Sequence, residues 1–202
     1  MECIICAEYI DSVARLSTFG ACNHCDICSV CFLRIRALQR KFACPTCKTE
    51  LDKIICCKES NKKFEDFSIW GDSIGDGYTY DERSQIFFPK EYFKEKIEPL
   101  FRFQCKVCRQ TRRDFKSLKG HLGAEHKLSM CQLCIDFKQV FPAEQIYYSQ
   151  KDFEKHMRHG DADGSIGHPM CEFCRTRYYD STALFIHLSK DHYTCHLCEK
   201  MG

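Results

Sequence analysis

Four closely spaced pairs of metal-binding side chains stand within the first 47 residues of the chain. The pairs consist of seven cysteines and one histidine, namely Cys3 and Cys6, Cys22 and His24, Cys28 and Cys31, and Cys44 and Cys47. A structural zinc ion is held by four sulfur or nitrogen ligands in tetrahedral geometry. These eight side chains therefore suffice for two zinc ions.

The order of the pairs resembles that of RING domains, in which the first and third pairs share one zinc ion and the second and fourth share the other. The resemblance implies one site of Cys3, Cys6, Cys28 and Cys31 and a second site of Cys22, His24, Cys44 and Cys47. Two unrelated zinc knuckles or a disulfide framework are the alternatives. Cys25 competes with His24, because Cys22 and Cys25 also form a CxxC pair. We prefer His24, whose spacing is accepted in RING domains, and treat Cys25 as a spare thiol.

Further along, the same ligand types recur at the spacing of C2H2 zinc fingers. One set is Cys105, Cys108, His121 and His126, and another is Cys171, Cys174, His187 and His192. Between these sets stand Cys131, Cys134 and His156, whose fourth partner is either His159 or His168. Cys195 and Cys198 look like the first half of another finger. The complete sets together predict about five zinc ions per chain.

Composition favours zinc over disulfides. The 202 residues include 18 cysteines and nine histidines, which indicates a metal or disulfide scaffold. Disulfide scaffolds belong to secreted proteins, and the N-terminal residues show no signal-peptide pattern. No apolar run approaches the roughly 20 residues that a membrane span needs. We therefore expect a reducing compartment, without a membrane partner.

The net charge of the chain and the small size of its units further limit the possible functions. The formal net charge is only +2, so nucleic-acid contact must come from local patches rather than from the whole chain. Units of about 30 to 60 residues bury too little apolar surface to fold alone, and zinc must contribute to their folding.

Short elements must position the N-terminal ligands. Residues 31–38 carry apolar side chains at helical spacing, and residues 53–57 read as a strand in which Cys56 and Cys57 pack rather than bind metal. Glycines in residues 69–80 predict turns, and residues 84–88 predict a short strand. A helix over 90–97 is expected to stop before Pro99 and to pack on the next finger.

The fingers need helices that carry their histidines. The first of these is predicted over 114–121, with Leu118 in the small core, and another over 151–159. The first finger is rich in cations that suit contact with RNA phosphates, although an ordinary solvated helix face is an equal alternative. The candidate RNA contacts are Arg109, Arg112, Arg113, Lys116 and Lys119.

We accordingly expect small zinc-stabilised α+β modules. The order is an N-terminal cross-brace RING (residues 1–57), a mixed spacer (58–100) and a C2H2 finger of ββα type (101–128). An atypical C2H2-like finger with an insert (129–169), a second C2H2 finger (170–193) and an incomplete finger (194–202) follow.

Several runs in the second half resemble one family. They are the run Lys151-Asp152-Phe153-Glu154-Lys155-His156, the run Gly167-His168-Pro169-x-Cys171-x-Phe173-Cys174, and Cys195-His196-x-Cys198. Together with the RING they are similar to the RING/C2H2 ubiquitin ligases that sense collided ribosomes. The recurrence of His168 in the second run favours it over His159 as a ligand.

The resemblance implies a function. It predicts a RING-type E3 ubiquitin transferase, cytoplasmic, that takes ubiquitin from a ubiquitin-conjugating enzyme (E2). The ubiquitin goes to small-subunit proteins of stalled ribosomes, which starts ribosome-associated quality control. No residue acts as a catalytic nucleophile. By resemblance, Ile5, Ile35 and Pro45 line the groove that docks the E2, and Lys48 stands where ligases commonly carry arginine. The fingers would bind ribosomal RNA or protein.

Two other classes of function are open. One is a non-enzymatic zinc-finger protein that binds nucleic acid, although the fingers lack the short uniform linkers of arrays that track the DNA major groove. The other is a signalling adaptor that combines a RING with zinc fingers.

Overall fold

The computed structural model describes residues 1–11, 13–59 and 62–193, and the chain divides into two compact units. The first unit contains Met1–Arg102 and a short segment from later in the sequence, Gln139–Glu144. The second contains Phe103–Lys138 and the chain from Gln145 onward. Both are small structures of helices and short strands, so the α+β class is confirmed.

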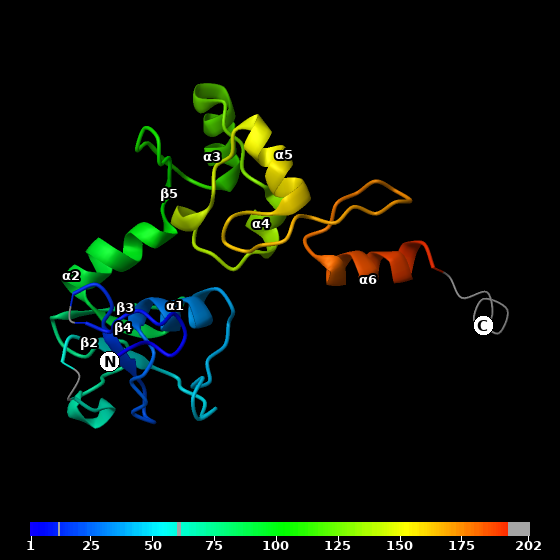
Figure 1. Ribbon diagram of the computed structural model, residues 1–202. Helices are drawn as coiled ribbons and strands as arrows, with labels where there is room; N and C mark the ends of the chain where they lie inside the picture. Colours follow the sequence, from blue (N-terminus) through cyan, green and yellow to red (C-terminus); the bar gives the residue numbers. More distant parts are fainter. Residues whose placement is uncertain (12, 60–61, 194–202) are drawn as a thin grey trace, which may run out of the picture. The chain divides into compact units, whose positions relative to one another are not determined.

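A four-stranded sheet forms the centre of the first unit (Figure 1). Its strands are β1 (Ser17–Phe19), β2 (Ile54–Cys57), β3 (Tyr78–Asp81) and β4 (Ile86–Pro89), in the order β1-β2-β4-β3. The β1–β2 and β3–β4 pairs are antiparallel, whereas β2 and β4 are parallel. The sheet therefore joins residues 1–57 and the segment predicted as a spacer in one structure.

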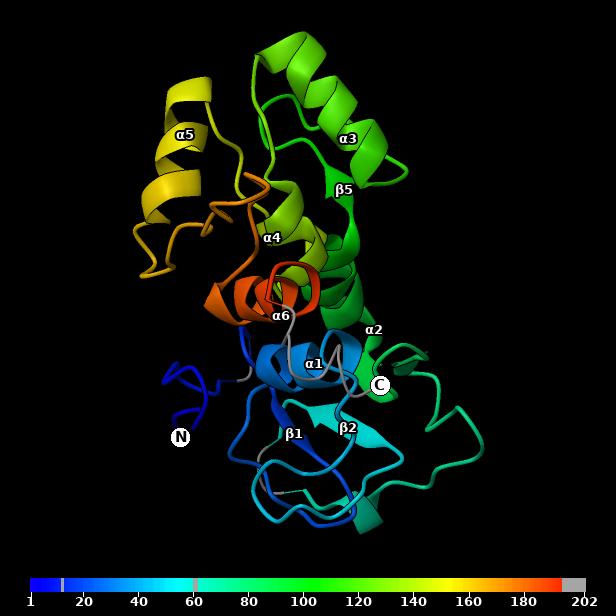
Figure 2. The same ribbon diagram turned by 90° about the vertical axis from the view of Figure 1, so that its right-hand side faces the viewer.

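Both faces of this sheet are covered. Side chains of a strand alternate between faces, and those of β2 divide between two apolar clusters. Ile54 lies in the larger core with Phe32 and Leu33 of helix α1 (Ser29–Ala37), while Ile55 lies in a second cluster with Phe19. Figure 2 shows α1 beside β1 and β2. Burial on both faces explains why β2 is a continuous apolar run.

Two predictions for the spacer were wrong. Residues 78–80 were placed in turns, but Tyr78–Asp81 forms β3, because its backbone pairs with β4 and the Tyr80 ring packs on Phe87 at 4.8 Å between centroids. The helix was expected to stop before Pro99 and to pack on the next finger. It runs as α2 (Lys90–Tyr92), a π-helical turn (Phe93–Ile97) and a 3-10 turn (Glu98–Phe101).

The continuation of this helix has a simple cause. Pro99 stands in the first turn of the 3-10 segment, a position at which proline is tolerated. The apolar side chains of the helix face the first unit. Tyr92 and Ile97 are buried in its core, and the Tyr92 hydroxyl bonds Ser29 Oγ at 2.7 Å.

The second unit is built from short helices and one small hairpin. Its elements are β5 (Phe103–Gln104), β6 (Thr111–Arg112), α3 (Phe115–His121), α4 (Gln132–Phe137), α5 (Gln150–His159) and α6 (Ser181–Asp191). Side chains cap three of the helices: Asp114 accepts from Ser117 N, Ser149 from Asp152 N, and Asp180 from Ala183 N. Within the described residues, no helix has the length and apolarity that a membrane crossing requires.

Candidate metal centres

The eight N-terminal ligand residues lie in two groups of four. One group contains Cys3, Cys6, Cys28 and Cys31, and the other contains Cys22, His24, Cys44 and Cys47. In each group the candidate ligand atoms lie within 4.8 Å of one another. Each group thus combines alternate pairs of the sequence, so the two sites are interleaved.

The spacing of the ligand atoms fits zinc. Cys6 Sγ and Cys28 Sγ are 3.9 Å apart, and so are Cys44 Sγ and His24 Nδ1. Zinc–sulfur bonds of about 2.3 Å in a tetrahedron place two sulfurs about 3.8 Å apart, whereas a disulfide needs about 2.0 Å. The cysteines of the described residues are free thiols.

Neighbouring groups stabilise thiolates, the form that binds metal. A hydrogen bond with Cys31 and, to a smaller extent, the Arg15 guanidinium, 3.4 Å from Cys28 Sγ, lower the pKa of Cys28 to about 4. A hydrogen bond with Thr49 lowers the pKa of Cys47 to about 6. These contacts favour the thiolate form of one ligand in each N-terminal group.

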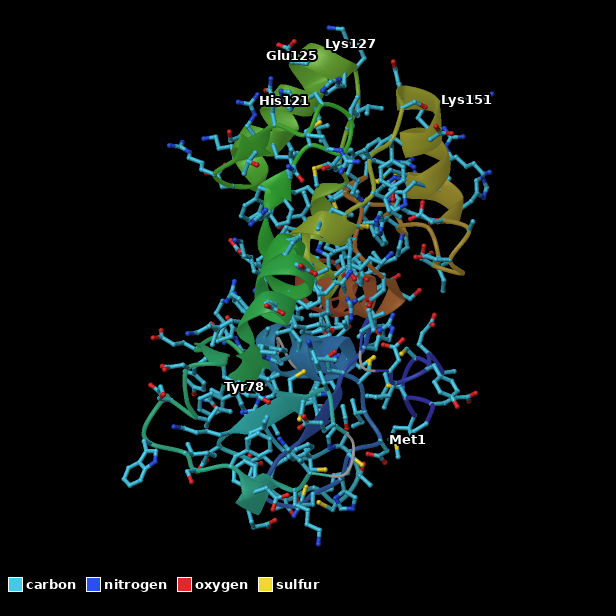
Figure 3. All side chains as sticks on the ribbon, turned by 90° about the vertical axis from the view of Figure 1, so that its left-hand side faces the viewer. Met1, Tyr78, His121, Glu125, Lys127 and Lys151 are labelled. Atoms are coloured by element: carbon cyan, nitrogen blue, oxygen red, sulfur yellow. The ribbon has the colours of Figure 1, made fainter. Side chains whose placement is uncertain are left out.

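The third group contains Cys105, Cys108, His121 and His126. The cysteines flank the turn of the β5–β6 hairpin, and the histidines stand on α3 and on the π-helical turn that extends it (Leu122–His126). His121, Glu125 and Lys127 follow one another along this segment (Figure 3). Cys108 Sγ lies 3.2 Å from His121 Nε2. His126 Nε2 is buried and has no hydrogen-bond partner among the described residues, which fits a metal ligand.

The fourth group bears on the choice between His168 and His159. It contains Cys131, Cys134, His156 and His168, and all four side chains are buried, whereas His159 is exposed. His168 Nε2 lies 3.3 Å from Cys131 Sγ and 3.4 Å from Cys134 Sγ. The structure therefore places His168, and not His159, with the other three ligands.

Two glycines allow the loop after α5 to bring His168 to the fourth group. A Cβ on Gly160 would lie 1.8 Å from Ser165 O, and one on Gly167 would lie 2.3 Å from Arg158 O. The loop between these glycines thus closes backbone against backbone, and His168 N bonds Met157 O at 3.0 Å. These glycines are the sequence signal that supports His168, because only glycine permits such close approach.

The fifth group contains Cys171, Cys174, His187 and His192. Cys174 Sγ lies 3.4 Å from His187 Nε2, and the buried His192 Nε2 has no hydrogen-bond partner among the described residues. A hydrogen bond with Thr176 lowers the pKa of Cys174 to about 5.

The hydrogen-bond partners of the candidate histidine ligands also suit zinc at the fourth and fifth groups. A metal-bound imidazole donates its other N–H to a carboxylate or carbonyl. His156 Nδ1 lies 3.1 Å from Asp161 Oδ1, His168 Nδ1 lies 2.9 Å from Tyr179 O, and His187 Nδ1 lies 2.7 Å from Asp191 Oδ2. His121 differs, because its Nδ1 faces the Arg112 guanidinium at 2.8 Å. All five donor sets could hold zinc, and His121 has the poorest outer contact among these histidines.

The remaining cysteines of the described residues do not join the groups. Cys25 packs beside the second apolar cluster and Cys57 lies within it, while Cys56 is fully buried, and burial raises its pKa. Cys195 and Cys198 lie outside the described residues, so the predicted incomplete finger has no structural description.

The candidate RNA contacts divide into two kinds. Arg109, Arg113 and Lys116 are exposed. Arg112 is half-buried and donates to Gln110 Oε1 at 2.6 Å besides facing His121, and Lys119 donates to Gln132 Oε1 at 2.6 Å. Three of the five side chains therefore present their charge to solvent.

The candidate docking residues lie on the first unit. Ile35, Pro45 and Lys48 line one hollow of about 510 Å³. Ile5 is outside this lining and is 49% exposed, so it is not a core residue. Asp26 connects the loops of Ile5 and Pro45, because its backbone oxygen accepts from Ile4 N and its carboxylate accepts from Thr46 Oγ1 at 3.2 Å. Lys48 Nζ turns back to donate to Pro45 O at 2.7 Å.

The fold and these groups define a protein of small α+β units built around five Cys/His clusters that could bind zinc. No protein-family model matches the chain. Across 99% of its length it is 33% identical to the E3 ubiquitin-protein ligase hel2 of Schizosaccharomyces pombe. Over the same share it is 32% identical to HEL2 of Saccharomyces cerevisiae and 30% identical to ZNF598 of Danio rerio.

These relatives confirm the resemblance predicted from the sequence. Over nearly its whole length the chain is similar to the ZNF598/Hel2 E3 ubiquitin-protein ligases. It spans 27% of the length of hel2, 30% of HEL2 and 20% of the fish ZNF598.

Proposed function

We propose that the chain carries the RING domain and the first zinc fingers of an E3 ubiquitin ligase. The observation that supports this most directly is the interleaving of the two N-terminal groups, which is the ligand order of a cross-brace RING. The C2H2 architecture of the later groups, with zinc in all five, is part of the same proposal. The names of the homologues point to ligase activity, an E2 and ubiquitin.

The mechanism is one of positioning. A closed four-ligand zinc site offers no coordination position for activating water, so the bound ions would only shape the surface. The ligase holds the E2 and its ubiquitin thioester where a substrate lysine attacks the carbonyl carbon and the E2 cysteine leaves. Fixing the reactants in this geometry accelerates the reaction.

Ile5, Ile35 and Pro45 would form the apolar contact with the E2. We expect Ile5→Ala combined with Ile35→Ala to abolish discharge of the loaded E2 while zinc content stays unchanged. Ile166→Ala combined with Ile186→Ala is the matched control, because both of these isoleucines are exposed in the second unit. Undiminished discharge by the first double variant would refute the groove.

The proposed substrate is the ribosome, and the proposed location is the cytoplasm. The exposed Arg109, Arg113 and Lys116 would contact ribosomal RNA, and the other fingers RNA or protein. Reconstituted ubiquitylation of collided and single ribosomes tests this. We expect preferential modification of small-subunit proteins in collided ribosomes, and equal modification of both would contradict collision sensing.

The same exposed cations support a second candidate, a non-enzymatic nucleic-acid-binding protein. This alternative predicts salt-dependent affinity for duplex DNA, with no effect of the chain on E2 discharge.

A further inference from the structure

Arg36 of helix α1 is fully buried and uses every hydrogen-bond donor that an arginine has. A guanidinium carries five N–H groups. Nε donates to Ser84 O, Nη1 to Phe42 O and Leu51 O, and Nη2 to Asp52 O and Gln85 Oε1. All five acceptors are uncharged oxygens, four of them from the backbone.

These acceptors come from two separate segments. Phe42, Leu51 and Asp52 stand at the two ends of the loop that contains Cys44, Pro45, Cys47 and Lys48. Ser84 and Gln85 form the turn between β3 and β4. The Arg36 guanidinium also lies over the Phe42 ring, 4.7 Å from its centroid. The buried Arg36 side chain thus bridges the two ends of the loop over residues 42–52. It also connects this loop to the β3–β4 turn.

This connection reaches the candidate docking surface. Ile35 precedes Arg36 on α1, and Pro45 and Lys48 stand on the clamped loop; all three line the same hollow. A zinc ion bound by Cys44 and Cys47 would hold the tip of this loop. The contacts of Arg36 at residues 42, 51 and 52 hold its base.

We propose that Arg36 is a positioning residue for the E2-docking surface and that the β3–β4 turn supports this surface through its contacts with Arg36. The proposal rests on the proposed ligase function. It assigns to the segment predicted as a spacer the role of holding Pro45 and Lys48 at a fixed orientation relative to Ile35. Arg36 itself, being buried, does not touch the E2.

Three variants of the full chain test the proposal. Arg36→Lys keeps the charge but loses the planar fork of donors. Gln85→Ala removes only the bond to the turn side chain, and so provides a milder change if Arg36→Lys fails to fold. Arg34→Lys is the matched control: it is an arginine of the same helix, but its guanidinium pairs with Glu144 at 2.6 Å. For each variant we measure the zinc content and the affinity for the E2. We also measure the rate at which the loaded E2 is discharged at a saturating concentration of the chain.

A positioning role predicts a separation between affinity and the maximal rate. Arg36→Lys should retain zinc and bind the E2 about tenfold more weakly, and Gln85→Ala should bind about two- to fourfold more weakly. Discharge at saturation should change less than affinity, because misplaced docking residues weaken the complex rather than the chemistry. Arg34→Lys should keep its affinity. Amide resonances of residues 43–50 should shift in the Arg36 and Gln85 variants alone.

The outcomes are distinguishable. A folded, zinc-loaded Arg36→Lys with unchanged E2 affinity overturns the proposal, as does a Gln85→Ala variant without any shift at residues 43–50. If the unchanged chain does not discharge the E2, the ligase function fails instead, and the resonance shifts alone decide whether Arg36 orients the loop.

Discussion

At the scale of single residues, Lys48 is the proposed donor to the E2–ubiquitin pair, and it lacks the planar guanidinium of arginine. Its ammonium bonds Pro45 O of its own loop at 2.7 Å. Arginine would keep the charge and add a planar fork of donors. We expect Lys48→Arg to raise the discharge rate about three- to tenfold, through one additional charge-assisted hydrogen bond.

Two controls accompany this prediction. Lys48→Met removes the donor and should lower discharge, whereas Lys94→Arg makes the same exchange at an exposed lysine outside the hollow and should leave it unchanged. A rate for Lys48→Arg at or below that of the unchanged chain would show that this position does not contact ubiquitin or the E2.

His168 and His159 allow a direct test of the metal assignment. His168 is buried beside the sulfurs of Cys131 and Cys134, whereas His159 is exposed. We expect His168→Ala to lower zinc content by one ion per chain and His159→Ala to leave it unchanged, as measured by elemental analysis of purified protein. His168→Cys should restore the ion, because cysteine is also a zinc ligand. Equal stoichiometry in the two alanine variants would contradict the assignment.

The sequence could indicate which residues lie in the groups, because the ligand types and their CxxC and C2H2 spacing are typical of zinc sites. The resemblance to RING domains and to one family implied how the N-terminal pairs combine and favoured His168. It could not indicate the role of Arg36. A buried arginine satisfied by backbone oxygens belongs to no spacing pattern, since its partners at residues 42, 51, 52, 84 and 85 are defined only by the fold.

At the scale of elements, the insert Gln139–Glu144 belongs to the first unit although it stands between the ligands of the fourth group. Phe141 is fully buried in the core of the first unit and contacts Phe101 edge to face at 5.1 Å. Arg34 donates to both oxygens of Glu144, at 2.9 and 2.6 Å. This segment therefore contributes a core side chain and an ion pair to the surroundings of α1.

Phe141→Ala should accordingly destabilise the first unit. Loss of a buried phenylalanine costs about 3–5 kcal/mol, so amide hydrogen exchange should accelerate in peptides that contain β2 and β4. Phe137→Ala is the matched control, because Phe137 is 56% exposed and belongs to the second unit, and it should leave those peptides unchanged. Unaltered protection of β2 and β4 in Phe141→Ala would mean that the insert does not stabilise this core.

The elements also show which parts of the fold could not be predicted from sequence patterns. α1, β2 and α5 have apolar periodicity or composition of their own, and they were predicted. β3 was missed because Gly75 and Gly77 precede it closely and its pairing partner β4 lies beyond a turn. Phe141 gave no signal, because a single aromatic residue in a short insert does not reveal which core receives it.

At the scale of the whole molecule, the five groups differ in how well the surrounding structure protects a metal. The fourth group is buried at all four ligands, and its histidines bond Asp161 and the Tyr179 carbonyl. The third group has an exposed ligand, Cys108, and its His121 faces a guanidinium. Since partners of the ligands change metal affinity about 10- to 100-fold, these differences should order the release of zinc.

We predict that a chelator removes zinc from the third group before the fourth. Zinc release into a colorimetric chelator should be multiphasic, and Cys105→Ser with His126→Ala should abolish a fast phase, whereas Cys131→Ser with His168→Ala should abolish the slowest one. Replacing Arg112 by glutamine, which can offer an oxygen to His121 Nδ1, should slow the fast phase. Because metal binding to small modules is coupled to folding, hydrogen-exchange protection of α3 should be lost in the same phase, while that of α5 persists. Simultaneous loss from both groups would mean that one cooperative unfolding event, rather than the local surroundings of each ion, controls release.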